Sequence, residues 1–243
     1  MPRSFQILQD HQSIDPLAKC HIQNRLQTDR DTKVHRRRII LDVIEYYYAL
    51  ASPWSFIGNG KLQEIADEFG LKIDPIIIDY DEMFTAAETV PLPKRPRLRK
   101  EYRLVDLKRW AAFRNVTFNV EPQFYQGEVE EPNERDGALM VVAAKEAGLD
   151  SLKLAHAFSR ALWAEQRFPF VRDELIAIAT AEGFDGEVLW ERSRSDAIAE
   201  SYANNTRQSI DRNVFGMPFY IVDGQPYWGQ DRLELIEYQL SHS

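Results

Sequence analysis

The 243-residue sequence is short of cysteine and of long apolar runs. Its one cysteine, Cys20, cannot form a disulfide within the chain. No segment approaches the roughly 20 apolar residues of a membrane-spanning helix, and the first residues lack the apolar centre of a secretory signal peptide. We therefore expect a cytoplasmic protein without a membrane partner, in a compartment that keeps thiols reduced.

The sequence also lacks an excess of positive charge and a recognisable cluster of metal ligands. Lys and Arg number 30 against 38 Asp and Glu, a formal net charge of -8, which argues against a nucleic-acid partner. Neither a Gly-x-Gly-x-x-Gly motif nor a phosphate-binding loop motif occurs. The acidic residues Asp79, Asp81 and Glu82 have no histidine near them in the sequence, so we expect no metal site.

What the sequence does contain begins with an apolar run and a helix signal. Residues 39–50 are almost continuously apolar, which is typical of a buried parallel strand. Ser52 and Pro53 are typical N-cap and first-turn residues, and Gly70 is a typical terminator. We predict a helix over 53–69 and a second strand over 71–78, which together make a β-α-β unit with parallel strands.

The middle of the sequence is helical in pattern. Residues 79–96 are acidic and then proline-rich, and predict a loop that leaves the sheet. Residues 97–196 contain helical periodicity throughout. The first helical face in this segment consists of Tyr102, Val105, Arg109, Trp110 and Phe113. We therefore predict that residues 97–196 form an inserted helical subdomain.

The C-terminal part returns to strand patterns. Residues 218–222 begin with Pro218, the pair Asp223–Gly224 predicts a hairpin turn, and 225–229 form the returning strand. A closing helix is expected over 231–240. The predicted fold class is α/β, with one mixed sheet built from 39–96 and 197–243, and with residues 1–38 as an N-terminal extension.

The turn Ser52-Pro53-Trp54-Ser55 carries a resemblance to a known family. The element order, with a proline opening the third strand, resembles the thioredoxin fold in its DsbA-like form, in which a Cys-Pro-x-Cys turn begins the first long helix. Serines replace both cysteines here, so thiol–disulfide exchange at this turn is excluded. The turn is similar to that of the glutathione-dependent branch, kappa-class glutathione transferases and 2-hydroxychromene-2-carboxylate isomerases.

Further segments match this branch in the same order along residues 42–240. They are Tyr102…Asp106…Arg109-Trp110, Ala161-Leu162-Trp163-Ala164-Glu165, Asn205-Thr206, Val214-Phe215-Gly216-Met217-Pro218 and Trp228-Gly229-Gln230-Asp231-Arg232.

The resemblance implies that glutathione is the cofactor. Ser52 would face the glutathione sulfur, where a hydroxyl and a helix N-terminus favour the thiolate. A cis Pro218 would expose the backbone of Met217 for pairing with an extended peptide. The cofactor-binding residues implied in this way are Ser52, Trp54, Met217, Pro218, Gln230 and Asp231.

Two departures from the branch affect the predicted substrate pocket. Glu88 or Thr89 stands where relatives carry an asparagine, and Phe124 lies in a changed His-Phe-Pro segment. We predict a pocket that includes Glu88, Trp110 and Phe124. The aromatic side chains that either line this pocket or belong to the helical core are Trp54, Phe56, Tyr102, Trp110, Phe124 and Trp163.

The resulting functional hypothesis is a glutathione-dependent isomerase, a homodimer like many relatives, that acts on an aromatic-degradation metabolite and uses Ser52 as its catalytic residue. A kappa-type transferase that releases the conjugate is an alternative. So is a module without chemistry that binds peptides at Met217–Pro218. At the residue level, Ser52 could also be an ordinary helix cap.

Overall fold

The computed structural model describes residues 43–122 and 133–242. These described residues belong to one compact unit by their contacts. The predictions made for residues 1–38, for the start of the first strand at 39–42 and for Phe124 lie outside the described residues.

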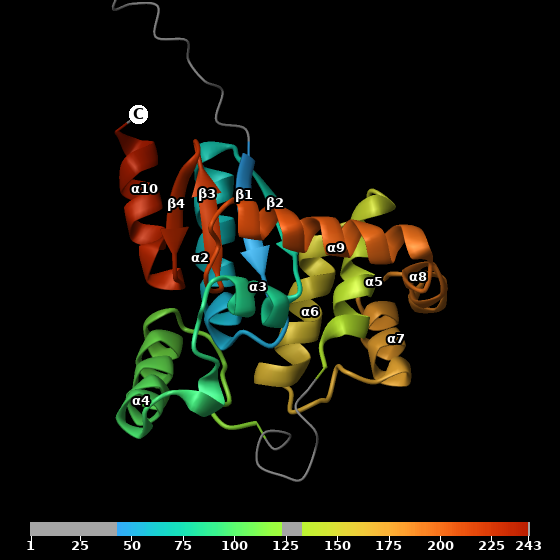
Figure 1. Cartoon of the computed structure of the whole chain (residues 1–243), viewed down its shortest axis with the longest axis horizontal. Helices are drawn as coiled ribbons and strands as arrows, with labels where there is room; N and C mark the ends of the chain where they lie inside the picture. The colour runs from blue at the N-terminus through green and yellow to red at the C-terminus, as the bar shows by residue number, and fades with distance from the viewer. Residues whose placement is uncertain (1–42, 123–132, 243) are drawn as a thin grey trace, which may run out of the picture. The chain divides into compact units, whose positions relative to one another are not determined.

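Within the described residues the sheet has four strands, which confirms the predicted mixed arrangement. They are β1 (Val43–Tyr48), β2 (Lys72–Ile77), β3 (Phe219–Val222) and β4 (Gln225–Trp228). Their order is β2-β1-β3-β4, with β1 parallel to β2 and the other two pairs antiparallel. Segments from both ends of the described chain thus lie side by side in one sheet (Figure 1).

Helix α2 (Pro53–Phe69) begins and ends as predicted. The side chain of Ser52 accepts a hydrogen bond from the Ser55 N–H, and Pro53 is the first helical residue. Gly70 has φ of 67°, a left-handed conformation that glycine adopts without a Cβ penalty. The sequence signals at the two ends of this helix therefore correspond to real cap geometry.

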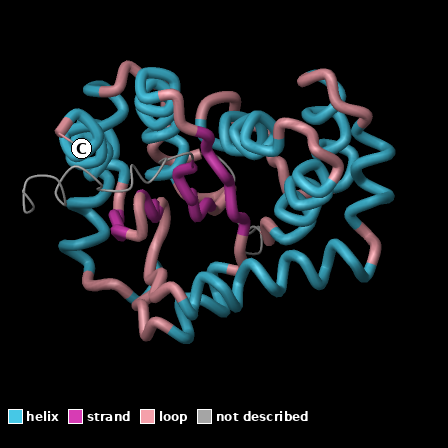
Figure 2. The backbone as a smooth tube through the Cα atoms, turned by 90° about the horizontal axis from the view of Figure 1, so that it is seen from above, coloured by secondary structure: helices cyan, strands magenta, loops and turns pink. Residues whose placement is uncertain are grey.

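The two faces of the sheet pack against different helices. Side chains alternate along β1, so that Ile44, Tyr46 and Tyr48 belong to the larger core cluster and Tyr47 belongs to a second cluster. The larger cluster contains residues from α2 and from the helices beyond β2, whereas the second contains Met83 from the segment after β2. Figure 2 shows the strands with helices on both sides.

The segment 79–96 is not a plain loop, contrary to the prediction. It contains helix α3 (Tyr80–Ala86) and a 3-10 turn, η1 (Leu92–Lys94). The Asp79 carboxylate accepts hydrogen bonds from the N–H groups of Asp81 and Glu82. The acidic residues of this segment thus include an N-cap and first-turn carboxylates, both of which stabilise a helix start.

The following segment is helical, as predicted. Its helices are α4 (Arg97–Phe113), α5 (Arg135–Glu146), α6 (Ser151–Trp163), α7 (Arg172–Ala181) and α8 (Gly186–Ser193). No strand occurs in the described parts of 97–196. The chain then forms α9 (Asp196–Asp211) and, after the sheet, η3 (Gln230–Arg232) and α10 (Leu233–Ser241). Among the described residues, no helix is long and apolar enough to cross a membrane.

Helix α4 presents its apolar face to the outside rather than to a core. Tyr102, Val105 and Phe113 are exposed, whereas Leu107 and Ala111 on the opposite face are buried. Tyr102 therefore belongs neither to the helical core nor to an enclosed pocket.

Candidate functional site

Ser52 lies at the start of α2 and beside the turn before β3. Its Oγ accepts from the Ser55 N–H at 3.2 Å and is 3.4 Å from the Met217 carbonyl oxygen, to which it can donate. The Met217–Pro218 peptide bond is cis. The structure therefore confirms the predicted cis bond and places the backbone of Met217 against the Ser52 turn.

The first turn of α2 has one backbone N–H group that is free to bind a ligand. Pro53 has no N–H, and the Ser55 N–H is bonded to the Ser52 hydroxyl. The Trp54 N–H is therefore the first-turn donor without a partner among the described residues. The first turn carries no acidic residue, so an anion held here would meet the partial positive charge of the helix without a competing carboxylate on α2.

The loop between β1 and α2 is fixed from the helical segment. The Ser159 hydroxyl, on α6, donates to the Leu50 carbonyl at 2.8 Å and lies 2.6 Å from the Tyr48 hydroxyl. Both hydroxyls are buried. A hydrogen-bonded chain thus runs from α6 through the loop to within two residues of Ser52.

A buried carboxyl group supports the same loop. Oε2 of Glu134, just before α5, accepts from the Ala51 N–H at 2.6 Å, and Glu134 is 3% exposed. Its Oε1 has no partner among the described residues. Burial raises the pKa of this carboxyl to about 8, against the lowering effect of hydrogen bonds from Ala51 and Leu50 N–H groups. The raised pKa favours the uncharged acid near neutral pH, so that Glu134 supports the loop without placing a full negative charge beside it.

The η3 turn lies next to the cis-proline turn. The Gly229 N–H donates to the Pro218 carbonyl at 2.9 Å. Gln230 is 2% exposed, and the Arg114 guanidinium donates to both its side-chain and its backbone oxygen at 3.2 and 3.1 Å. Gly58 of α2 packs so closely that a Cβ there would lie 2.6 Å from the Gln230 Cβ. Thus Gln230 anchors its turn to α2 and α4.

Asp231 is more accessible than Gln230. Its side chain is 40% exposed, and its Oδ2 is 2.7 Å from the Arg232 Nη1. A carboxylate at this position can face a ligand amine, because its ion pair with Arg232 lies at the surface and is worth little.

Two of the residues predicted to line a substrate pocket, Glu88 and Trp110, lie in different environments. Glu88 is exposed, with φ of 53°, and the next residue, Thr89, donates from its hydroxyl to the Phe215 carbonyl at 2.8 Å. This bond ties the Glu88 loop to the turn that leads to Met217. Trp110 is half-buried in an aromatic cluster with Trp54, Phe56, Phe118 and Trp163.

His156, on α6, packs against α2. Its ring stacks on Phe56 with centroids 5.4 Å apart, and its Nδ1 is 2.8 Å from the Asn59 Nδ2. Burial lowers the pKa of His156, so the neutral ring that can accept from Asn59 is favoured.

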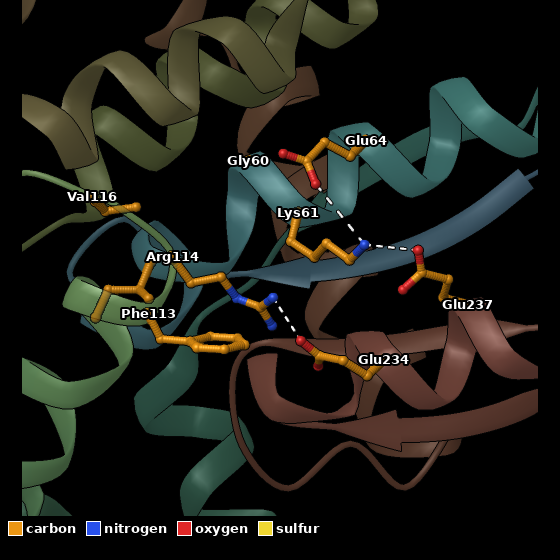
Figure 3. A pocket seen from close by; sticks show the side chains of 9 residues that line it. Gly60, Lys61, Glu64, Phe113, Arg114, Val116, Glu234 and Glu237 are labelled. Carbon is orange, nitrogen blue, oxygen red and sulfur yellow. Dashed lines mark hydrogen bonds and ion pairs between the residues drawn. The ribbon is translucent and has the colours of Figure 1, made fainter.

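A cavity of about 410 Å³ is lined by residues of α2, of α10 and of the end of α4 with the residues that follow it. Figure 3 shows its charged side chains in two groups: Arg114 paired with Glu234, and Lys61 paired with Glu64 and Glu237. Arg114 is 7% exposed and also holds Gln230. The cavity thus has a structural link to the candidate site. Within the described part of the chain, no group of three His, Cys, Asp or Glu side chains could hold a metal.

Four supporting residues went unnoticed in the sequence. Glu134 lies in a polar run, Glu130-Glu131-Pro132-Asn133-Glu134-Arg135, that gives no sign of burial. Ser159 and Arg114 act through contacts with residues more than a hundred positions away. Gly58 has ordinary helical backbone, and only its close approach to Gln230 distinguishes it.

Comparison with known proteins identifies the family. The DSBA-like thioredoxin domain matches residues 43–241. The 2-hydroxychromene-2-carboxylate isomerase of Pseudomonas putida is 26% identical over 198 residues, covering 80% of this chain and 92% of the relative. The Sphingobium xenophagum protein of the same name is 29% identical over 195 residues, with coverages of 80% and 95%.

Solved structures agree on the fold. A 2-hydroxychromene-2-carboxylate isomerase superposes with a TM-score of 0.68 at 26% identity, covering 82% of this chain and 95% of that one. A probable DsbA oxidoreductase from Streptomyces coelicolor gives 0.67 at 18% identity, with coverages of 82% and 88%. With Ser52 at its α2 start, cis Pro218 beside it and a family match over most of its length, the chain belongs to the DSBA-like thioredoxin domain family.

Proposed function

We propose that the protein is a glutathione-dependent isomerase of the 2-hydroxychromene-2-carboxylate isomerase type, acting on an aromatic-degradation metabolite. The observation that carries the proposal is the position of the Ser52 hydroxyl, at a helix N-terminus and beside the Met217 backbone. Relatives named as this isomerase support the reaction class. The proposed setting is a reduced cytoplasm.

The residues present fit glutathione. The Ser52 O–H and the spare Trp54 N–H can both donate to a thiolate, and Met217 offers its backbone to a short extended peptide. Asp231 can accept from the amine at the γ-glutamyl end, beside the anchored Gln230. When bound, glutathione would supply a thiolate nucleophile that adds reversibly to a conjugated substrate and leaves after bond rotation.

The chain's own groups have three tasks in this proposal. Ser52 and the α2 N-terminus stabilise negative charge on sulfur. The neutral Glu134 fixes the loop at Ala51 without adding charge. The aromatic cluster around Trp110 and Trp54 excludes water on one side of the turn.

Ser52→Ala tests the proposal. A hydrogen bond to a charged acceptor contributes roughly 1.5–3 kcal/mol and a helix N-terminus about 0.3–1 kcal/mol. Since one pKa unit is about 1.36 kcal/mol, we expect the bound thiol pKa to rise by about one to two units. Turnover should fall at neutral pH, with affinity for glutathione largely kept. Thiolate absorbance across a pH titration and isomerisation assays measure both.

The matched control is Ser195→Ala, which removes the serine N-cap of α9 and should lower stability alone. If Ser52→Ala behaves like this control, Ser52 is only a helix cap.

Asp231→Ala should have the opposite effect: it should weaken glutathione binding, measured by calorimetry, with less effect on the thiol pKa. A released conjugate instead of an isomer would indicate the kappa-type transferase. Binding without turnover would indicate the peptide-binding module.

A further inference from the structure

Arg114 is a buried cation that four neighbouring side chains hold in place. Its side chain is 7% exposed, and its Nη1 lies 2.6 Å from Oε1 of Glu234, on α10. Its guanidinium lies over the rings of Trp110 and Phe113, 5.2 and 5.6 Å from their centroids. Its Nε and Nη2 donate to the side-chain and backbone oxygens of Gln230. Residues of α4 and α10 thus fix a guanidinium against the η3 turn.

This contact decides which end of the Gln230 amide faces inward. A guanidinium has donors and no acceptor, so only Oε1 can face Arg114 and the N–H groups of Nε2 must point away from it. Nε2 makes no hydrogen bond to another described residue, although Gln230 is 2% exposed. Buried polar groups are nearly always hydrogen-bonded. The two N–H groups of this amide are therefore available for a ligand.

The free end of the amide belongs to the candidate site. Arg114 lines the 410 Å³ cavity and Gln230 does not, so Nε2, which points away from Arg114, does not face that cavity. Asp231 follows Gln230 in η3, and the Gly229 N–H holds this turn to the Pro218 carbonyl. An amide donor beside a carboxylate acceptor is complementary to a carbon atom that carries both a carboxylate and an ammonium group.

We infer that Arg114 is a positioning residue of the candidate site: it orients the Gln230 amide so that Nε2 donates to the α-carboxylate of a γ-glutamyl group. The identity of the ligand rests on the proposed function, and the inference adds how the chain selects that carboxylate. Arg114 itself does not touch the ligand, and Glu234 balances its charge. A lysine at this position would keep the charge but lacks the planar fork that binds two Gln230 oxygens and a carboxylate together.

Two peptides that differ by one carboxylate test the inference. S-methylglutathione has the complete γ-glutamyl group and no free thiol, and the S-methylated form of 4-aminobutyryl-cysteinylglycine lacks only the α-carboxylate. By calorimetry, the wild-type protein should bind S-methylglutathione about tenfold more tightly, because the hydrogen bond is made to a charged group. Arg114→Lys should remove this difference by weakening S-methylglutathione alone.

Two further variants serve as control and second test. Arg194 also pairs with a carboxylate, Asp136, and lies over an aromatic ring, Trp190, but in the helical segment. Arg194→Lys should therefore keep the wild-type difference between the two peptides. Gln230→Met removes the amide at similar volume and should abolish the difference, so the test holds even where Arg114→Lys does not fold.

The possible results separate a positioning role from a structural one. The inference is overturned if Arg114→Lys keeps the difference between the peptides, or if it weakens both equally, as a purely structural residue would. A wild-type protein that binds both peptides equally, or neither, overturns it as well. These measurements involve no thiol. A wild-type protein that shows the expected difference but isomerises no substrate with glutathione would overturn the proposed function and support the inference.

Discussion

Glu134 is a buried carboxyl group, which is rare in proteins unless a cation pairs with it. It is almost fully buried, its Oε2 accepts from the Ala51 N–H, and no cation pairs with it among the described residues. Its charged neighbours make ionisation harder: Asp79 and Asp81 both raise its pKa, after the larger effect of burial. The tyrosines near it, Tyr48 on β1 and Tyr202 on α9, stay neutral because burial raises their own pKa values.

This gives a pH-dependent stability with a definite sign. The folded pKa of about 8 lies above the ordinary value of 4.5, so protonation favours the folded state. The contribution is complete below pH 4.5 and is lost as pH rises through 8. Measured against Glu134→Gln, the wild-type free energy of unfolding should fall over this window by up to a few kcal/mol. Urea titrations at a series of pH values measure it.

Glu68→Gln removes a carboxylate at an exposed position and is the control. The fall in the free energy of unfolding over this pH window should persist in this variant as it does in the wild type. A parallel pH dependence of wild type and Glu134→Gln would mean that Glu134 is ionised throughout, with its charge compensated in a way that the described contacts do not show.

At the scale of elements, α2 is positioned by one close contact. Its backbone at Gly58 lies against Gln230, so a side chain at position 58 would push the η3 turn away. Gly60, one half-turn further, has no heavy atom within 4 Å of the position of a Cβ. A side chain is thus excluded at position 58 but has room at position 60 of the same helix.

Gly58→Ala and Gly60→Ala should change stability in opposite directions. Gly58→Ala overpacks the contact and should cost about 1–3 kcal/mol. It should also weaken glutathione binding, since Gln230 and Asp231 move together. Gly60→Ala should stabilise by up to about 1 kcal/mol through helix propensity. Thermal melts with and without glutathione measure both effects; equal destabilisation by the two variants would contradict the contact.

The elements that sequence could predict are those with local signals. The caps of α2, the apolar run of β1 and the Asp223–Gly224 turn each act within a few residues, and the predicted sheet is confirmed. The face of α4 could not be assigned, because periodicity shows that a stripe exists but not what covers it. Glu134 and Arg114 were missed because their partners are distant in sequence, and the predicted roles of Ser52 and Asp231 stay predictions.

At the scale of the whole molecule, the sheet and the helical segment share one core. The larger hydrophobic cluster includes Tyr46 and Tyr220 of the sheet, Leu62 of α2, and Ala143 and Phe158 of the helical segment. The predicted boundaries at residues 97 and 196 therefore do not coincide with a gap in this core. The two parts stabilise each other through buried apolar surface.

A shared core predicts one unfolding transition. Variants that keep only Trp190, in α8, or only Trp228, in β4, report on the two parts separately. Their fluorescence changes should coincide with each other and with circular dichroism in a urea titration. Midpoints that separate, with Trp190 changing first, would show that the helical segment unfolds by itself.

The hydrogen bond from Ser159 to the Leu50 carbonyl also limits how this protein could be re-engineered. Ser159 is on α6, in the helical segment, yet it fixes the loop that presents Ser52, and Glu134 fixes the next residue of the same loop. Exchanging the helical segment for that of a relative, as a means of transplanting substrate preference, would therefore remove both anchors. A working chimera would have to carry Ser159 and Glu134, or their equivalents, along with the grafted helices.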